Sequence, residues 1–136
     1  MQLWNSLDMS ELKKVLHVDD DADIRTIVEL SLGSIGGYTL LSCESGRKAI
    51  AKAPSFQPDL FLLDLMMPGM TGEETWRELR RLPRLEQVPV IFMTAKVQSD
   101  VSEALIQIGA LDVIAKPFNP LELPVSLRAA WDRIHT

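Results

Sequence analysis

Apolar residues along the chain gather into five short runs, separated by longer stretches of mixed character. The runs lie at residues 15–18, 38–43, 59–63, 88–93 and 111–115. Within each run most consecutive positions are apolar, and several are β-branched or aromatic, which is typical of a strand buried on both faces. The pattern therefore predicts five strands, each covered from two sides.

The stretches between the runs carry helical spacing or helix-end signals. In the first stretch, apolar and small residues recur at intervals of three and four, at Ile24, Ile27, Val28, Ser31 and Ile35. Asp23 is the candidate N-cap of this helix, and Gly36-Gly37 is its candidate end. The other helices are predicted at 46–53 with Ser45 as cap and Pro54 as end, at 71–82 ended by Pro83, and at 99–108 with Val101, Leu105 and Ile108 facing inward.

The last helix is predicted from Asn119, as its cap, to about Ile134, with Pro120 in the first turn. Pro124 also falls in this stretch, and a proline inside a helix removes a backbone hydrogen bond. A distorted first turn or a later start is therefore expected. Trp131 shares helical spacing with Leu127 and Ile134, which predicts at least partial burial of its ring.

Strands and helices alternate five times, with no signal for a β-hairpin. This order predicts an α/β fold in which a five-stranded parallel sheet is covered by helices on both faces, a doubly wound (βα)5 arrangement. In such sheets, ligands bind at the carboxyl ends of the strands, near a topological switch.

Composition narrows the class of protein. The 136 residues, 46% hydrophobic and 24% charged, suit one soluble globular domain. Residues 1–11 show no clear period and are predicted to be an N-terminal extension, native or a cloning remnant, before a domain at 12–134. A net charge of −5 disfavours a nucleic-acid or anionic-membrane surface. No stretch reads as a membrane span or signal peptide, which indicates a cytoplasmic protein.

Two residues with potential chemistry are assigned to the core. Cys43, the lone cysteine, cannot form an internal disulfide and fits a reducing compartment. Nothing near it in the sequence would lower the pKa of its thiol. His17 lies inside the first apolar run and is expected to be a core histidine.

The carboxyl ends of the predicted strands bring together residues from distant parts of the chain. They are Asp19, Asp20 and Asp21 after the first strand, Asp64 after the third, Thr94 and Ala95 after the fourth, and Lys116 after the fifth. Clustered carboxylates repel one another unless a cation lies among them. Oxygen ligands suit Mg²⁺ or Mn²⁺ rather than zinc.

This set of groups suits phosphoryl transfer. A divalent ion held by few protein oxygens leaves positions for phosphoryl oxygens, Lys116 can neutralise a further oxygen, and the Thr94 hydroxyl can donate to another. Asp64 ends an apolar strand and precedes a Pro-Gly turn, so its carboxylate is the candidate nucleophile.

The same residues resemble the receiver domain of bacterial two-component response regulators, including single-domain chemotaxis regulators. The matching segments are Val18-Asp19-Asp20, residues 64–72, Thr94-Ala95 and Lys116-Pro117-Phe118, in order and at the expected strand ends. The resemblance covers about residues 12–134 and implies a flavodoxin-like fold with strand order 2-1-3-4-5.

The resemblance implies a role for each residue near the acidic site. Asp64 would accept a phosphoryl group from the phosphohistidine of a partner kinase or from a small phosphodonor. Asp20 would bind the metal directly, Asp19 would orient a metal-bound water, and the backbone carbonyl of Met66 would complete the protein ligands. Asp21 would lie outside the metal shell as a solvated loop acid.

The resemblance also implies a switch. Thr94 would move toward the phosphoryl group, Lys116 would form a salt bridge with it, and Ala95 would leave space for it. Many receivers carry an aromatic residue at the position that Val113 occupies in this chain. Valine has no ring, so an aromatic rotamer change cannot occur here. The resemblance therefore implies no route by which the signal would reach the surface formed by the fourth predicted helix (99–108), the fifth strand (111–115) and the last helix. Met66 and Lys96 occupy variable positions that influence access of water to the phosphoryl group.

The sequence disfavours three other functions. A phosphatase of the haloacid dehalogenase type would need an aspartate where Met66 stands. A nucleotide or flavin binder would need a glycine-rich loop after the first strand, where an acidic triplet stands instead. An inactive receiver-like module is disfavoured by the complete set of acceptor, metal and lysine residues. The expected protein is a signalling phosphoacceptor and not an enzyme, apart from its own phosphorylation and slow dephosphorylation.

The expected partners follow from that function. They are a sensor histidine kinase or phosphotransfer protein, an unknown downstream protein and, after phosphorylation, a second copy of the chain. Neither nucleic acid nor membrane is expected to bind this chain. With two residues after Ile134, the chain is expected either to be a single-domain regulator that acts by protein contact or to be part of a longer protein.

Overall fold

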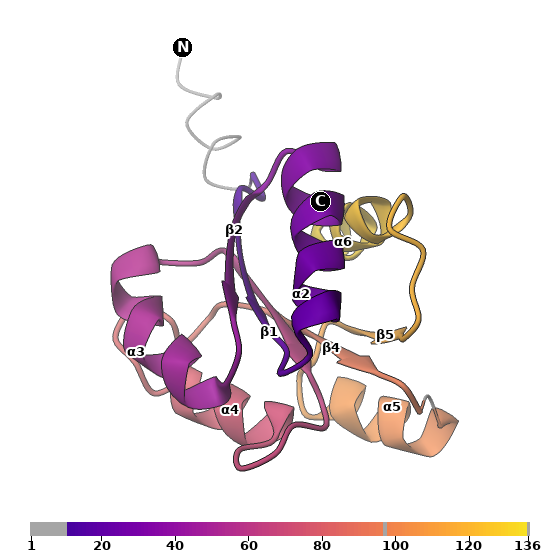
Figure 1. Ribbon diagram of the computed structural model, residues 1–136. Coiled ribbons are helices and arrows are strands. Elements are labelled where there is room, and N and C mark those ends of the chain that lie inside the picture. The colour runs from indigo at the N-terminus through magenta and orange to yellow at the C-terminus, as the bar shows by residue number, and fades with distance from the viewer. Residues whose placement is uncertain (1–10, 97, 136) are drawn as a thin grey trace.

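Five strands and the helices between them make up the computed structural model, which describes residues 11–96 and 98–135 (Figure 1). In chain order the elements are β1 Lys14–Val18, α2 Ala22–Val28, η1 Glu29–Ile35, β2 Thr39–Cys43, α3 Gly46–Phe56, β3 Leu60–Asp64, α4 Gly72–Leu79, β4 Val90–Thr94, α5 Ser99–Gln107, β5 Asp112–Ala115 and α6 Leu123–Arg133. Each predicted strand is present, with ends that differ by one or two residues. The predicted extension at 1–11 lies almost wholly outside the described residues and stays a prediction.

The strands form one parallel sheet in the order β2-β1-β3-β4-β5. This confirms the α/β doubly wound fold and the strand order 2-1-3-4-5. The register pairs Val18 with Leu63 and with Cys43, and it pairs Asp64 with Met93. Because neighbouring strands end at the same level, the loops after β1, β3, β4 and β5 meet at one edge of the sheet.

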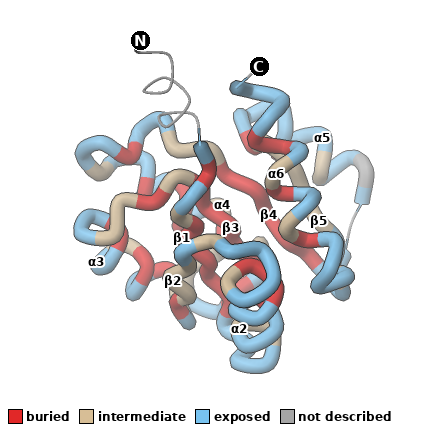
Figure 2. The backbone as a smooth tube through the Cα atoms, turned by 90° about the horizontal axis from the view of Figure 1, so that it is seen from above, coloured by how far each residue is buried: buried red, intermediate tan, exposed pale blue. Residues whose placement is uncertain are grey.

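Helices cover both faces of the sheet and enclose two apolar cores (Figure 2). One core packs beneath α3, α4 and α5 and includes Phe61, Trp76 and Phe92. The other lies beneath α2, η1 and α6 and includes Leu62 and Trp131. Residues of β3 and β4 are buried throughout, as the continuous apolar runs predicted.

Helix ends differ from the prediction where a side chain or a core contact decides them. Asp21, not Asp23, caps α2, because its carboxylate accepts from the N–H groups of Asp23 and Ile24. Helix α3 continues past Pro54 to Phe56. Pro54 removes only one backbone donor, and Phe56 packs against the first core. Helix α4 ends at Leu79 rather than at residue 82.

The first helix changes character half-way along. Its second half, η1, is a π-helix in which the N–H of Gly36 donates to the carbonyl of Ser31, five residues earlier. This wider turn rotates later residues away from the sheet, so Ile35 is 54% exposed although the 3.6-residue period predicted it inside. Ile27 is also exposed, because Val28 and Leu32 fill the core.

The last two helices also depart from the prediction. Leu105 of α5 is buried, but Val101 and Ile108, predicted on the same inward face, are exposed. Helix α6 begins at Leu123 with Pro124 in its first turn, which confirms the later start. The Asn119 side chain accepts from the N–H of Leu121 instead of capping this helix.

Core assignments for several residues are confirmed. Cys43 is 3% exposed, and burial raises the pKa of its thiol. His17 is fully buried, and its Nδ1 lies 2.8 Å from the Ser42 hydroxyl oxygen. Burial, followed by the charges of Lys116 and Arg25, lowers the pKa of His17 to about 3. Trp131 is buried as expected.

Among the described residues, none of the helices has the length and apolar character that a membrane span requires.

Candidate functional site

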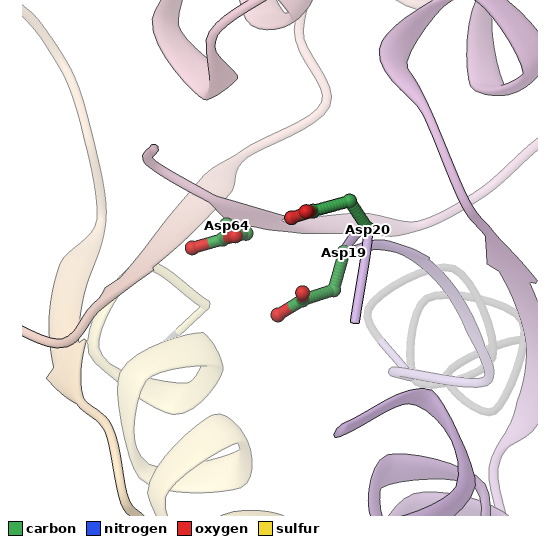
Figure 3. A group of neighbouring side chains, drawn as sticks. All are labelled: Asp19, Asp20 and Asp64. Atoms are coloured by element: carbon green, nitrogen blue, oxygen red, sulfur yellow. The ribbon is translucent and has the colours of Figure 1, made fainter. Parts of the chain in front are cut away.

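Three carboxyl groups converge at the carboxyl edge of the sheet (Figure 3). Asp19 and Asp20 follow β1, Asp64 ends β3, and their nearest oxygens all lie within 4.8 Å of one another. Asp19 and Asp64 are buried, whereas Asp20 is exposed to solvent. Asp21, the fourth acid of the sequence-predicted group, is exposed and serves as the N-cap of α2.

Backbone hydrogen bonds hold the acidic loop after β1. The N–H of Asp19 donates to the carbonyl of Cys43 at 3.1 Å, which extends the pairing of β1 with β2. The N–H of Asp21 donates to Asp19 Oδ1 at 2.9 Å. On the other side, Arg25 Nη1 donates to the carbonyl of Asp19 at 2.8 Å. Sequence reasoning missed Arg25; its signal was a cation one turn into the helix that follows the acids.

A loop follows Asp64, and backbone hydrogen bonds hold its two ends. The N–H of Leu65 donates to Met93 on β4, and the N–H of Gly72 donates back to Leu65. A Cβ at Gly72 would lie 2.2 Å from the carbonyl oxygen of Asp64, so only glycine fits there. Gly69 has a φ of +79°, a conformation that glycine adopts without strain.

Lys116 supplies the cation of the site. Its Nζ lies 3.0 Å from Asp19 Oδ2 and 3.2 Å from Asp64 Oδ1, so one ammonium bridges the two buried carboxylates. The N–H of Lys116 donates to the carbonyl of Thr94, which fixes the base of the side chain. Burial alone would lower the pKa of Lys116, but the hydrogen bond and charge of Asp19, with those of Asp64, raise it above its ordinary value.

Burial and neighbouring negative charge both act on Asp64. Burial, and then the charge of Asp19, raise the pKa of Asp64 from 3.8 to about 6, although Lys116 opposes the change. A second cation among the three carboxylates would relieve this repulsion. The donor set is oxygen only and includes an exposed carboxylate, so the residues fit a hard divalent ion such as Mg²⁺.

Comparison with known proteins identifies this arrangement. The family model of the response regulator receiver domain matches residues 15–128, a stretch that contains every strand-end residue described above. The chain belongs to the response regulator receiver family. Receiver domains are signalling phosphoacceptors rather than classical enzymes, and they accept phosphoryl groups from histidine kinases at an acidic, Mg²⁺-binding site.

Similar proteins include curated transcriptional regulators and a solved chemotaxis protein. The phosphate regulon transcriptional regulatory protein PhoB of Pseudomonas aeruginosa is 40% identical over 121 residues, which cover 89% of this chain and 52% of that protein. The alkaline phosphatase synthesis transcriptional regulatory protein PhoP of Bacillus subtilis is 33% identical over 89% of this chain and 49% of its own length. The chain thus spans about half the length of the curated relatives it matches.

Among solved structures, the chemotaxis protein CheY4 of Vibrio cholerae superposes with a TM-score of 0.80 and 32% sequence identity. The match covers 88% of this chain and 99% of that one.

The receiver domain has a pocket of about 270 Å³ beside Asp64, lined also by Met66, Thr94, Ala95, Lys96 and Lys116. Met66 is 72% exposed. The structure therefore brings the predicted phosphoacceptor, switch and lysine residues to one cavity. Ala95 contributes only a methyl group to the wall, so it occupies little of the space.

The Thr94 hydroxyl of this receiver domain is engaged with its own loop. It accepts a hydrogen bond from the N–H of Lys96 at 3.2 Å and lies 3.4 Å from the carbonyl oxygen of Lys96. A rotation of Thr94 toward the pocket would leave both backbone groups of Lys96 without this partner. Thr94 is thus coupled to the segment that precedes α5.

Val113 lies outside the pocket, on β5. It is partly buried, pairs in register with Phe92 and packs against the first core. A β-branched side chain that is packed in this way has few rotamers to exchange. Val113 therefore holds β5 against β4 and offers no ring that could swing between solvent and core.

Proposed function

We propose that Asp64 accepts a phosphoryl group from the phosphohistidine of a sensor histidine kinase or phosphotransfer protein. Asp20, Asp64 and the backbone carbonyl of Met66 would bind a Mg²⁺ or Mn²⁺ ion, and Asp19 would hold it through a water molecule. The observation that carries the proposal is the convergence of three carboxylates within 4.8 Å, two of them bridged by Lys116.

In the transfer step, an Asp64 carboxylate oxygen attacks phosphorus as the P–N bond of the phosphohistidine breaks. The bonding electron pair returns to the imidazole nitrogen, and an acyl phosphate forms on Asp64. A bound divalent ion supplies charge neutralisation for the phosphoryl oxygens. Lys116 would exchange its contact with Asp64 for one with the phosphoryl group, and the small side chain of Ala95 would leave room for it.

The proposed output begins at Thr94. A phosphoryl group adds a charge of about −1.5 to −2 and strong acceptor oxygens, so it competes with Lys96 for the Thr94 hydroxyl. Loss of the Lys96 contacts would change the start of α5, a helix with Leu105 buried and Val101 exposed. The surface formed by α5, β5 and α6 is the proposed binding face for a downstream protein or a second phosphorylated copy. Because Val113 on β5 offers no aromatic ring, the proposed route of the signal runs through Thr94 and its loop.

Acetyl phosphate tests the proposed chemistry without the unidentified kinase. Incubation with Mg²⁺ is expected to add one phosphoryl group per chain in an intact-mass measurement, because Asp64 is the one of the three carboxylates that lines the pocket. Removal of Mg²⁺ with EDTA is expected to prevent the addition. Unmodified protein in the presence of Mg²⁺, with acetyl phosphate and with phosphoramidate, would contradict the proposal.

A further inference from the structure

Arg25 reaches from α2 to the acidic loop. Its Nη1 donates to the carbonyl of Asp19 at 2.8 Å, and the residue is partly buried. An arginine in the second turn of an amphipathic helix ordinarily extends into solvent. This one turns back toward the end of the strand that the helix follows, and its guanidinium contacts the backbone of Asp19.

The contact fixes a peptide plane that matters for the site. The carbonyl of Asp19 and the N–H of Asp20 belong to one planar unit, so restraint of the carbonyl restrains the start of Asp20. The N–H of Asp19 is held by Cys43, and Asp21 is held by the Asp19 carboxylate. Arg25 adds to these a restraint on the carbonyl of Asp19 that comes from a side chain of α2.

Asp20 needs this help more than its neighbours. Asp19 and Asp64 are buried and bonded to Lys116, whereas Asp20 is exposed and follows the end of β1. Its carboxylate direction therefore depends on the backbone to which it is attached. A carboxylate held in place in advance binds a cation more tightly than one that must be ordered on binding.

We infer that Arg25 is a positioning residue, which orients Asp20 for the divalent cation through the carbonyl of Asp19. The inference rests on the proposed function, since it assumes that Asp20 is a metal ligand. The positive charge of Arg25 acts in the opposite direction, because a cation near the site repels Mg²⁺. We expect the hydrogen bond to dominate, since it acts directly on the loop that carries Asp20.

Two substitutions test whether a cationic donor is needed at position 25. Arg25→Met removes both and keeps an unbranched side chain, whereas Arg25→Lys keeps a cationic donor. Isothermal titration of the protein with Mg²⁺ is expected to give a Kd about tenfold higher for Arg25→Met and within about threefold of wild type for Arg25→Lys. Arg81→Met, which removes an exposed ion pair with Glu78, is the matched control and is expected to leave the Kd unchanged.

The backbone amide resonance of Asp20 provides a second measurement. Its chemical shift without metal is expected to move in Arg25→Met and to stay near the wild-type position in Arg25→Lys. Equal Mg²⁺ affinity of Arg25→Met and wild type, or tighter binding by Arg25→Met, would overturn the inference. Phosphorylation at saturating Mg²⁺ is expected to be retained by Arg25→Met. A wild type that binds Mg²⁺ but takes up no phosphoryl group would instead contradict the proposed function.

Discussion

Replacement of Lys116 with methionine is expected to lower the free energy of unfolding at pH 8 by about 3 kcal/mol or more. The Lys116 ammonium contacts Asp19 and Asp64, whose side chains are 0% and 5% exposed. Without it, two buried carboxylates face each other with no cation between them. Protonation of one carboxyl limits the penalty at low pH, so the loss is expected to be smaller at pH 5 than at pH 8. Urea denaturation of wild type and variant at both pH values measures the effect.

Lys96→Met is the matched control for this prediction. Lys96 lines the same pocket but is exposed, so its replacement is expected to change stability by less than about 0.5 kcal/mol. Mg²⁺ is expected to restore part of the stability lost in Lys116→Met, since it supplies the missing positive charge. Equal stability of Lys116→Met and wild type at pH 8 would show that the ammonium does not hold the carboxylates together.

Asp64→Asn is expected to stabilise the metal-free protein at pH 7.5 by about 2–3 kcal/mol, while it removes the proposed nucleophile. Burial and Asp19 raise the pKa of Asp64 in the folded protein from 3.8 to about 6. Between these values the folded state holds a proton that the unfolded state has lost. Stability therefore falls as the pH rises from about 4 to about 6, and above pH 6 the whole penalty of the buried charge remains.

The introduced amide avoids this penalty. It has the shape of the carboxylate, can accept from Lys116 and can donate to Asp19 or Asp20, so no polar group loses its partner. The stability of the variant is not expected to fall between pH 4 and pH 6 as that of the wild type does. Mg²⁺ is expected to stabilise the variant less than the wild type. Asp132→Asn, at an exposed position of α6, is the control and is expected to keep the wild-type pH profile. An Asp64→Asn protein less stable than wild type at pH 7.5 without metal would refute this account of the charge.

The fold and the composition of the site were predictable from the sequence because both depend on strands. Apolar runs marked β1, β3 and β4, and parallel pairing brings their carboxyl ends together whatever the intervening helices do. Asp64 and Lys116 are nearly adjacent in space although 52 positions, 116 − 64, separate them, and the strand-end rule alone placed them at one edge.

The remaining features depend on local backbone geometry and side-chain reach, which periodicity does not encode. Ile35 lies in a π-helix and is exposed, although its spacing predicted an inward position. Val101 is likewise exposed on α5. The contact of Arg25 with the Asp19 carbonyl and that of Thr94 with Lys96 each involve a backbone group. Almost every residue has a backbone donor and acceptor, so a sequence pattern does not reveal which of them will form a hydrogen bond with a given side chain.

The most direct measurement identifies the residue that carries the phosphoryl group. Protein treated with acetyl phosphate and Mg²⁺ is reduced with sodium borohydride, which converts an aspartyl phosphate into homoserine, and its peptides are then sequenced by mass spectrometry. Homoserine is predicted at position 64 in the wild type, and at no position when EDTA replaces Mg²⁺ or in Asp64→Asn. Homoserine at Asp19 or Asp20, or a phosphorylated protein without homoserine at position 64, would contradict the assignment of Asp64 as the phosphoacceptor.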